Sequence, residues 1–332
     1  MREKKSISIL IIGLIVVVSF SGCVSEQKPK VYHVGILSGL NLFSGIADSF
    51  KEELRKLGYV ENQTIFYDFQ QTNYEPEREK QILDTFVNDK VDLIFGFNTE
   101  VALEAKEATK GTGIPLVFAN AFTEGNTLIE NISHPGGNIT GVRYPSIDVA
   151  VKRLEILHEL VPQAQRIWLP YQQDYPAVPS ELEILTPAAT ALNLTILEFS
   201  SKNLSHLQTE LEQRSHSEDI GFDAVLLIPE SLSTTKAAFQ TIANFTRDQK
   251  IPVGGSRIVT DDYGTLFAVT VNNTEIGIQA AHLADKILRG IPAGTIPVVS
   301  PETHIVINIK VAQELGINVS EGLLVRADEV IH

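Results

Sequence analysis

Cysteine is almost absent from this chain: Cys23 is the only one among 332 residues. A disulfide within the chain is therefore excluded, and so is a metal site built from several cysteines. The eight histidines are scattered singly, which is more typical of surface or core histidines than of metal ligands. We expect neither a metal ion nor a cofactor.

Basic residues are also scarce, with 27 Lys and Arg against 41 Asp and Glu and a formal net charge of −14. Nucleic-acid phosphates attract basic faces, so this balance argues against a nucleic-acid partner. Because 43% of the residues are hydrophobic and 20% are charged, the chain is expected to fold and not to be disordered.

The motifs of common nucleotide-binding and hydrolytic enzymes are missing. No G-x-x-x-x-G-K-[ST] loop and no H-E-x-x-H motif occurs, and no G-x-G-x-x-G follows the first expected strand. Two segments approach the G-x-S-x-G nucleophile elbow, but one misplaces Ser38 and the other has Ile258 where glycine is required. We therefore expect no catalytic residues and no enzymatic activity.

The N-terminus has the pattern of a secretory signal peptide. A basic head at residues 2–5 precedes an apolar run at residues 7–20, and the small residues Ser21 and Gly22 lead directly to Cys23. A transmembrane helix needs about 20 apolar residues, which is more than this run offers. An uncleaved membrane anchor is the alternative, because apolar length alone separates the two poorly.

The residues F-S-G-C at positions 20–23 resemble the lipobox of prokaryotic lipoproteins, with Phe20 where leucine is usual. This resemblance implies that residues 1–22 are removed and that Cys23 carries the lipid as the first mature residue. The polar residues 23–30 then form a tether. The expected location is extracytoplasmic, anchored to the cell membrane.

The rest of the chain alternates between expected strands and helices, which is typical of parallel sheets covered by helices. It is longer than one compact core of ordinary size, so two α/β domains are expected. The expected strands are residues 31–37, 64–70, 91–97, 114–118, 166–171, 194–200, 222–229, 251–255, 266–271 and 305–309. The expected helices are residues 46–57, 75–88, 99–110, 148–160, 180–192, 204–214, 233–249 and 275–289.

Three stretches resemble the family of ABC-transporter substrate-binding proteins that includes tryptophan-uptake-type binding proteins. The first combines HPGGNITGVRYP with VAVKRLEILHELVPQAQRIWL, the second is GIQAAHLADKILRGIPAGTIPV, and the third is the C-terminal THIVINIKVAQELGINVSEGLLVRADEVIH. The early segments fit in order and spacing, so the resemblance covers nearly all of the chain after the signal peptide.

The resemblance implies a type I periplasmic-binding-protein fold, in which two lobes close on a ligand between them. Each lobe is a parallel sheet flanked by helices, and the chain crosses between lobes near Tyr144, Asn272 and Ser300. Lobe 1 is expected to hold residues 31–143 plus 272–300, and lobe 2 residues 144–271 plus 301–332.

Ligands bind beyond the carboxyl ends of strands in open parallel sheets, so we expect the site where the strands end. The candidates are Ser38, Gly39, Asn41, Asn98, Thr99, Asn120, Phe122, Tyr144, Tyr171, Glu230, Ser256 and Asn272. The serine, threonine and asparagine residues among them could equally be helix caps or turn formers. The aromatic residues could equally serve core or interlobe packing.

Each kind of candidate suits one part of an amino acid. Hydroxyl and amide residues at helix starts suit a carboxylate, which accepts backbone N–H bonds there. Phe122, Tyr144 and Tyr171 could enclose a ring or alkyl group. Glu230 could pair with an ammonium group, although an acidic residue there also favours a helix start.

The family commonly shows an aspartate at the place of Asn272, which puts its usual way of binding an amine in doubt here. Glu230, helped by Asp261 or Asp262, could replace that aspartate. The expected function is binding of a small organic, amino-acid-like ligand for an ABC permease in the membrane. A ligand-binding receptor for a membrane sensor is the alternative.

Overall fold

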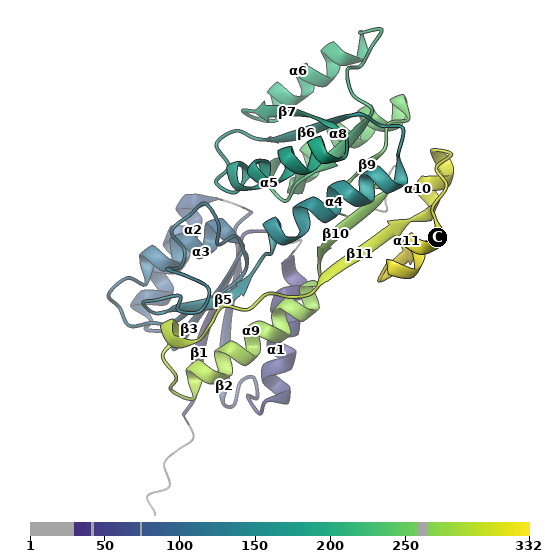
Figure 1. The fold of residues 1–332 in the computed structure, drawn as a ribbon. Coiled ribbons are helices and arrows are strands. Elements are labelled where there is room, and N and C mark those ends of the chain that lie inside the picture. The colour runs from purple at the N-terminus through teal and green to yellow at the C-terminus, as the bar shows by residue number, and fades with distance from the viewer. Residues whose placement is uncertain (1–29, 41–42, 74, 258–263) are drawn as a thin grey trace, which may run out of the picture. The chain divides into compact units, whose positions relative to one another are not determined.

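The computed structural model describes residues 30–40, 43–73, 75–257 and 264–332. They form two β-sheets, each with helices on both faces, so the expected α/β class is confirmed (Figure 1). The expected signal peptide, the lipidated Cys23, the tether up to residue 29, Asn41, Asp261 and Asp262 lie outside the described residues. None of the helices in the described ranges is long and apolar enough to cross a membrane.

The first sheet is parallel throughout, and both of its faces are covered. Every residue of the strand Leu93–Phe97 is buried, which explains the unbroken apolar run seen in the sequence. The strand order is β2 (Ile65–Gln71), β1 (Tyr32–Ser38), β3 (Leu93–Phe97), β4 (Leu116–Ala121) and β5 (Ile139–Arg143). One face packs on α1 (Ser44–Lys56) and α9 (Asn273–Leu288), the other on α2 (Pro76–Asn88) and α3 (Thr99–Ala108).

The second sheet is parallel except for one antiparallel pair, β10 with β11. Its order is β12 (Glu329–Ile331), β11 (Thr303–Asn308), β10 (Phe267–Val271), β9 (Val253–Gly255), β8 (Ala224–Leu227), β6 (Arg166–Gln172) and β7 (Thr195–Ser201). One face packs on α4 (Ser146–Leu160), α5 (Val178–Ala191), α10 (Ile309–Glu314) and α11 (Glu321–Arg326). The other packs on α6 (Leu204–Ser215), α7 (Ser231–Thr234) and α8 (Lys236–Gln249).

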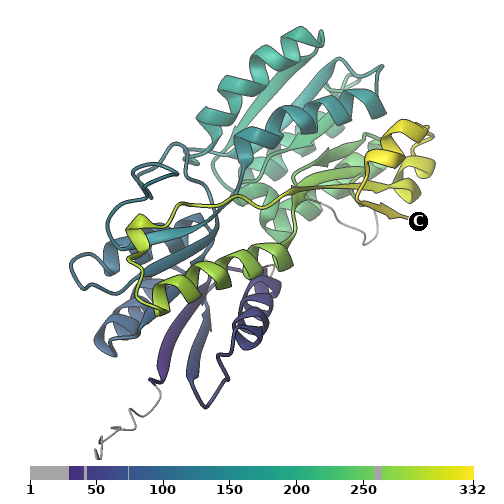
Figure 2. The same ribbon diagram turned by 60° about the horizontal axis from the view of Figure 1, so that its bottom comes forward.

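Helix α9 comes late in the chain but packs beside α1 on the first sheet (Figure 2). Tyr59 donates its hydroxyl hydrogen to Asp285 Oδ1 at 2.9 Å, and Tyr32 donates to the carbonyl of Leu288 at 3.0 Å. The two helices approach so closely that a Cβ atom on Gly277 would overlap α1. Tertiary packing, not chain order, therefore completes this sheet's core.

The chain passes between the sheets at three places within the compact unit Val31–His332. Tyr144 lies between β5 and α4, and Asn272 lies between β10 and α9. After the 3-10 helix η2 (Ala293–Thr295), Val299 pairs with Val142 before the chain reaches β11. The limits of the two lobes stay a prediction.

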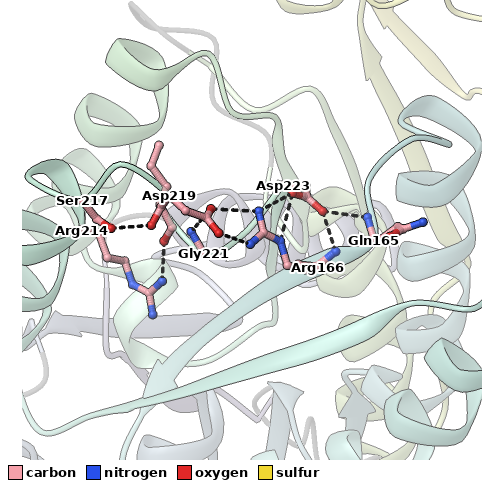
Figure 3. Close-up of polar contacts among 8 residues, drawn as sticks. Gln165, Arg166, Arg214, Ser217, Asp219, Gly221 and Asp223 are labelled. Carbon is pink, nitrogen blue, oxygen red and sulfur yellow. Dashed lines mark hydrogen bonds and ion pairs between the residues drawn. The ribbon is translucent and has the colours of Figure 1, made fainter.

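An exposed ion-pair network fastens the loop between α6 and β8 to the start of β6, as Figure 3 shows. Arg166 pairs with Asp219 at 2.8 Å and with Asp223 at 3.0 Å. Asp223 also accepts the backbone N–H groups of Gln165 and Arg166. The network lies at the amino end of β6, whereas the candidate ligand residues lie at its carboxyl end.

The strand β5 was not predicted from the sequence, and its glycine explains why. Gly141 gives a weak strand signal, but a Cβ atom there would overlap the Phe118 carbonyl oxygen of the neighbouring strand. The helix expected at residues 233–249 is instead two helices, α7 and α8, separated by Thr235 in extended conformation.

Candidate functional site

A cavity of about 240 Å³ lies at the carboxyl ends of strands from both sheets. This is the place where open α/β sheets bind ligands. Its lining combines aromatic, amide and hydroxyl side chains with two ionisable ones. The lining residues are Phe43, Asn98, Thr99, Asn120, Phe122, Tyr144, Tyr175, Pro229, Glu230, Ser256, Arg257, Thr270, Val271 and Asn273.

The structure brings seven of the expected ligand residues together in this cavity, namely Asn98, Thr99, Asn120, Phe122, Tyr144, Glu230 and Ser256. Four others, Ser38, Gly39, Tyr171 and Asn272, are not among its lining residues. Asn41 lies outside the described residues. Contact of any of these residues with a ligand stays a prediction.

The expected residues outside the lining make local contacts of their own. Ser38 is fully buried and donates its hydroxyl hydrogen to the Leu40 carbonyl at 2.9 Å. Tyr171 donates to Glu198 Oε2 at 2.9 Å. Asn272 caps α9, because its side-chain oxygen accepts the backbone N–H of Thr274 at 2.8 Å. The contacts of Ser38 and Asn272 are the turn and helix-cap roles that these residue types often have.

Asn120 has an unusual conformation for a residue near a strand end. Its φ of 50° lies in the left-handed region, and the pairing of β4 with β5 shifts register around it. Its Oδ1 atom is buried and has no hydrogen-bond partner among the described residues. Strained positions of this kind cluster at functional sites, and Asn120 carries a buried acceptor that no described residue satisfies.

Three aromatic rings form a connected wall of the cavity. Phe122 meets Tyr144 edge to face with ring centroids 5.5 Å apart, and it meets Tyr175 at 6.1 Å. Thr99 Oγ1 accepts the backbone N–H of Phe122 at 3.0 Å and so fixes the start of this segment. A wall of this kind suits an aromatic or apolar group.

Glu230 acts as a capping residue in the cavity wall. Its carboxylate accepts the backbone N–H groups of Gln172, Leu232 and Ser233, at 2.8, 2.7 and 2.6 Å. Burial raises its pKa to about 7, although these three N–H groups oppose the shift. The helix-start role considered for this residue is therefore present; pairing with an ammonium group stays a prediction.

Arg257 is a lining residue that the sequence analysis missed. Its Nη1 donates to the Ser233 carbonyl at 3.3 Å, and its guanidinium lies 5.0 Å from the Phe239 ring centroid. Burial lowers its pKa. Arg257 directly follows Ser256 at the end of β9, and this position could have identified it in the sequence as a lining residue.

The other missed lining residues are Phe43, Tyr175, Pro229, Thr270, Val271 and Asn273. Thr270, Val271 and Asn273 flank Asn272, so the predicted crossing pointed to the correct segment but to a capping residue in it. Among the described residues, no group of three or more His, Cys, Asp or Glu side chains is placed to hold a metal ion.

Comparison with known proteins gives a family match over most of the chain. The profile of ABC transporter substrate-binding proteins matches residues 36–331. A tyrosine-binding protein of Clostridioides difficile (strain R20291) is 26% identical over 323 residues, which cover 92% of this chain and 91% of that protein.

Two solved structures share the fold. An ABC domain from Streptococcus pneumoniae in complex with L-Trp is 24% identical with a TM-score of 0.80, covering 91% of this chain and all 100% of that one. A ligand-free, open substrate-binding protein with adhesive properties from Clostridium difficile is 22% identical with a TM-score of 0.68, covering 91% and 99% of the two chains. These likenesses bear on the fold alone.

Proposed function

The chain belongs to the family of ABC transporter substrate-binding proteins, and from this premise we propose that it captures an aromatic amino acid for an ABC permease. The family resemblance found in the sequence is thereby confirmed, and so is the type I periplasmic-binding-protein fold. The cavity between the two sheets is the proposed binding site, and the permease is the proposed membrane partner.

The observation that carries the proposal is the aromatic wall of the cavity, formed by Phe122, Tyr144 and Tyr175. A volume of about 240 Å³ is below the usual range of drug-sized ligand pockets and suits one amino acid. The relatives add support, because one is described as tyrosine-binding and another was solved with L-Trp.

The two sheets and their helices are the proposed lobes, with the limits expected from the sequence. The site lies at the strand ends of both sheets, and three segments connect them. In this arrangement a ligand gains contacts from both lobes only when they come together, which favours hinge closure.

The proposed location is extracytoplasmic, with the chain held at the membrane by a lipid on Cys23. The support is the signal-peptide pattern and the lipobox-like residues 20–23. Delivery to a permease requires this side of the membrane, so location and function are consistent.

The test is a thermal-shift screen of the full chain, purified in detergent, against amino acids, short peptides, sugars and nucleosides. Calorimetry then measures the dissociation constants of the hits. Binding of L-tyrosine or L-tryptophan with a raised melting temperature is expected. Binding restricted to sugars or nucleosides would contradict the amino-acid proposal.

A further inference from the structure

Behind the aromatic wall, three buried side chains form a line of polar contacts that leads away from the cavity. Tyr144 lines the cavity, Arg153 lies on α4 and Glu181 lies on α5. Arg153 is fully buried and donates Nη2–H to Tyr144 Oη at 2.7 Å and Nε–H to the Val269 carbonyl at 3.0 Å. Its Nη1 lies 3.7 Å from Glu181 Oε1.

This geometry restricts the direction of the Tyr144 hydroxyl hydrogen. A guanidinium has only donors, so Tyr144 Oη accepts from Arg153, and its own hydrogen is left for a group other than Arg153. The Thr270 hydroxyl lies within hydrogen-bonding reach of Tyr144 and also lines the cavity. Both residues therefore belong to the cavity lining, and the donor of Tyr144 is directed away from Arg153.

The charge behind Tyr144 is positive and poorly balanced. Three atoms have no hydrogen-bond partner in the part of the chain that the structure describes. They are both carboxyl oxygens of Glu181 and the Nη1 of Arg153. Burial raises the pKa of Glu181 to about 8, although Arg153 opposes this shift. Near neutral pH, the carboxyl group of Glu181 is then largely protonated, and Arg153 remains a buried cation that an anion can stabilise.

The cavity lining therefore carries both acceptor and donor groups. On the first sheet, the buried Oδ1 of Asn120 is an acceptor without a partner among the described residues. Among the other lining residues, the hydrogen-bonded hydroxyls of Tyr144 and Thr270 offer a donor, and Arg153 places a cation behind Tyr144. An amino acid has a matching pair of groups, because its ammonium donates and its carboxylate accepts.

We propose that the hydroxyl groups of Tyr144 and Thr270 bind the ligand's carboxylate, and that Arg153 is a positioning residue which holds and polarises the Tyr144 hydroxyl. The inference rests on the proposed function, and it deepens it by assigning the ligand's carboxylate to these two hydroxyl groups. A hydrogen bond to an ionised group is stronger than one between neutral groups, and the buried cation strengthens it further.

The test compares L-tyrosine with tyramine, which keeps the ring and the ammonium group but lacks the carboxylate. In the full chain, Tyr144→Phe removes one hydroxyl and keeps the ring. We expect this variant to weaken L-tyrosine binding by about 10- to 100-fold and tyramine binding by less than about 3-fold. Thr270→Val should act in the same direction. Tyr59→Phe is the matched control and should change neither affinity, because Tyr59 lies outside the cavity lining and donates to Asp285.

The role of Arg153 is tested through the ratio of the affinities for L-tyrosine and tyramine. Replacing Arg153 alone would leave Glu181 buried without a partner, so the double variant Arg153→Met, Glu181→Met removes both polar groups together. We expect weaker L-tyrosine binding, by roughly 5- to 30-fold, with tyramine little changed. Arg153→Lys, which keeps the charge, should lose less than the double variant.

The outcomes separate this inference from the function on which it rests. Equal losses for L-tyrosine and tyramine in Tyr144→Phe would overturn the carboxylate assignment while the amino-acid proposal stands. An unchanged affinity ratio in the Arg153 double variant would overturn the positioning role. Failure of the unmodified chain to bind any amino acid would overturn the proposed function, and this inference with it.

Discussion

Glu230 accepts the backbone N–H of Gln172 at 2.8 Å, and this bond joins the segment after β8 to the carboxyl end of β6. The same carboxylate caps the start of α7 through the N–H groups of Leu232 and Ser233. A residue expected to touch the ligand therefore also joins the cavity lining to the end of β6.

The first prediction concerns this capping role. Glu230→Gln replaces one acceptor oxygen by an NH2 group, which faces a backbone N–H and cannot accept from it. We expect the free energy of unfolding to fall by about 1–3 kcal/mol, with weaker amino-acid binding as a result. Thermal or urea unfolding measures the loss. The exposed Glu198→Gln serves as control, and equal stability of the two variants would refute the capping role.

The second prediction is a dependence of stability on pH. Burial raises the pKa of Glu181 to about 8, with Arg153 opposing and Glu230 and Glu124 reinforcing the shift. Between pH 4.5, the ordinary pKa of a glutamate, and about pH 8, Glu181 keeps its proton in the folded chain but loses it in the unfolded chain. The free energy of unfolding therefore falls as the pH rises through this window. Glu181→Gln should flatten this slope, by on the order of 1–3 kcal/mol over the window.

Urea unfolding between pH 5 and about pH 8.5 measures both slopes. Glu230, whose burial raises its pKa to about 7, contributes in the same direction, so some slope should remain in the variant. Identical slopes in the variant and the unmodified chain would argue that Glu181 keeps its charge when buried.

The third prediction concerns the contact between α1 and α9. A Cβ atom on Gly277 would overlap Ser49 and Ile46 and lie 2.9 Å from the backbone nitrogen of Phe50. Gly277→Ala should therefore destabilise the chain by about 1–3 kcal/mol. Gly45→Ala on α1 is the control, because the nearest atom would be 3.9 Å away. A Gly277→Ala chain as stable as Gly45→Ala would show that the helices separate without cost.

The fourth prediction concerns the membrane anchor. If Cys23 carries the lipid, Cys23→Ser should release the protein from the membrane or leave the precursor uncleaved. Detergent-phase partitioning and the mass of the mature chain measure the change. Unchanged processing and unchanged partitioning in the variant would contradict lipidation at this residue.

The sequence by itself determined the fold class, the family and the segments that carry the site. Buried parallel strands are apolar along their whole length, and helices repeat their apolar residues every three or four positions, so both patterns are local. The rule that ligands bind at strand ends then pointed to Asn98, Asn120 and Phe122, which lie in the cavity lining.

Only the tertiary structure decided which side chain at each strand end faces the cavity. Asn272 lies between two lining residues, but its side chain caps α9 instead. Tyr171 lies at the end of a strand without lining residues, and its hydroxyl binds Glu198 on the neighbouring strand. Neighbouring residues of one loop point in different directions, and local sequence does not record those directions.

The buried line from Tyr144 through Arg153 to Glu181 depends on tertiary structure for the same reason. Arg153 and Glu181 look like the exposed charged residues that helices usually carry, and their helices α4 and α5 are adjacent only in the folded chain. The chemistry of Arg153 and Glu181 depends on their burial and on the distance between them. Burial and distance are both set by packing. The sequence therefore determined where a ligand is expected to bind, whereas packing decided which groups line the cavity and with what charge.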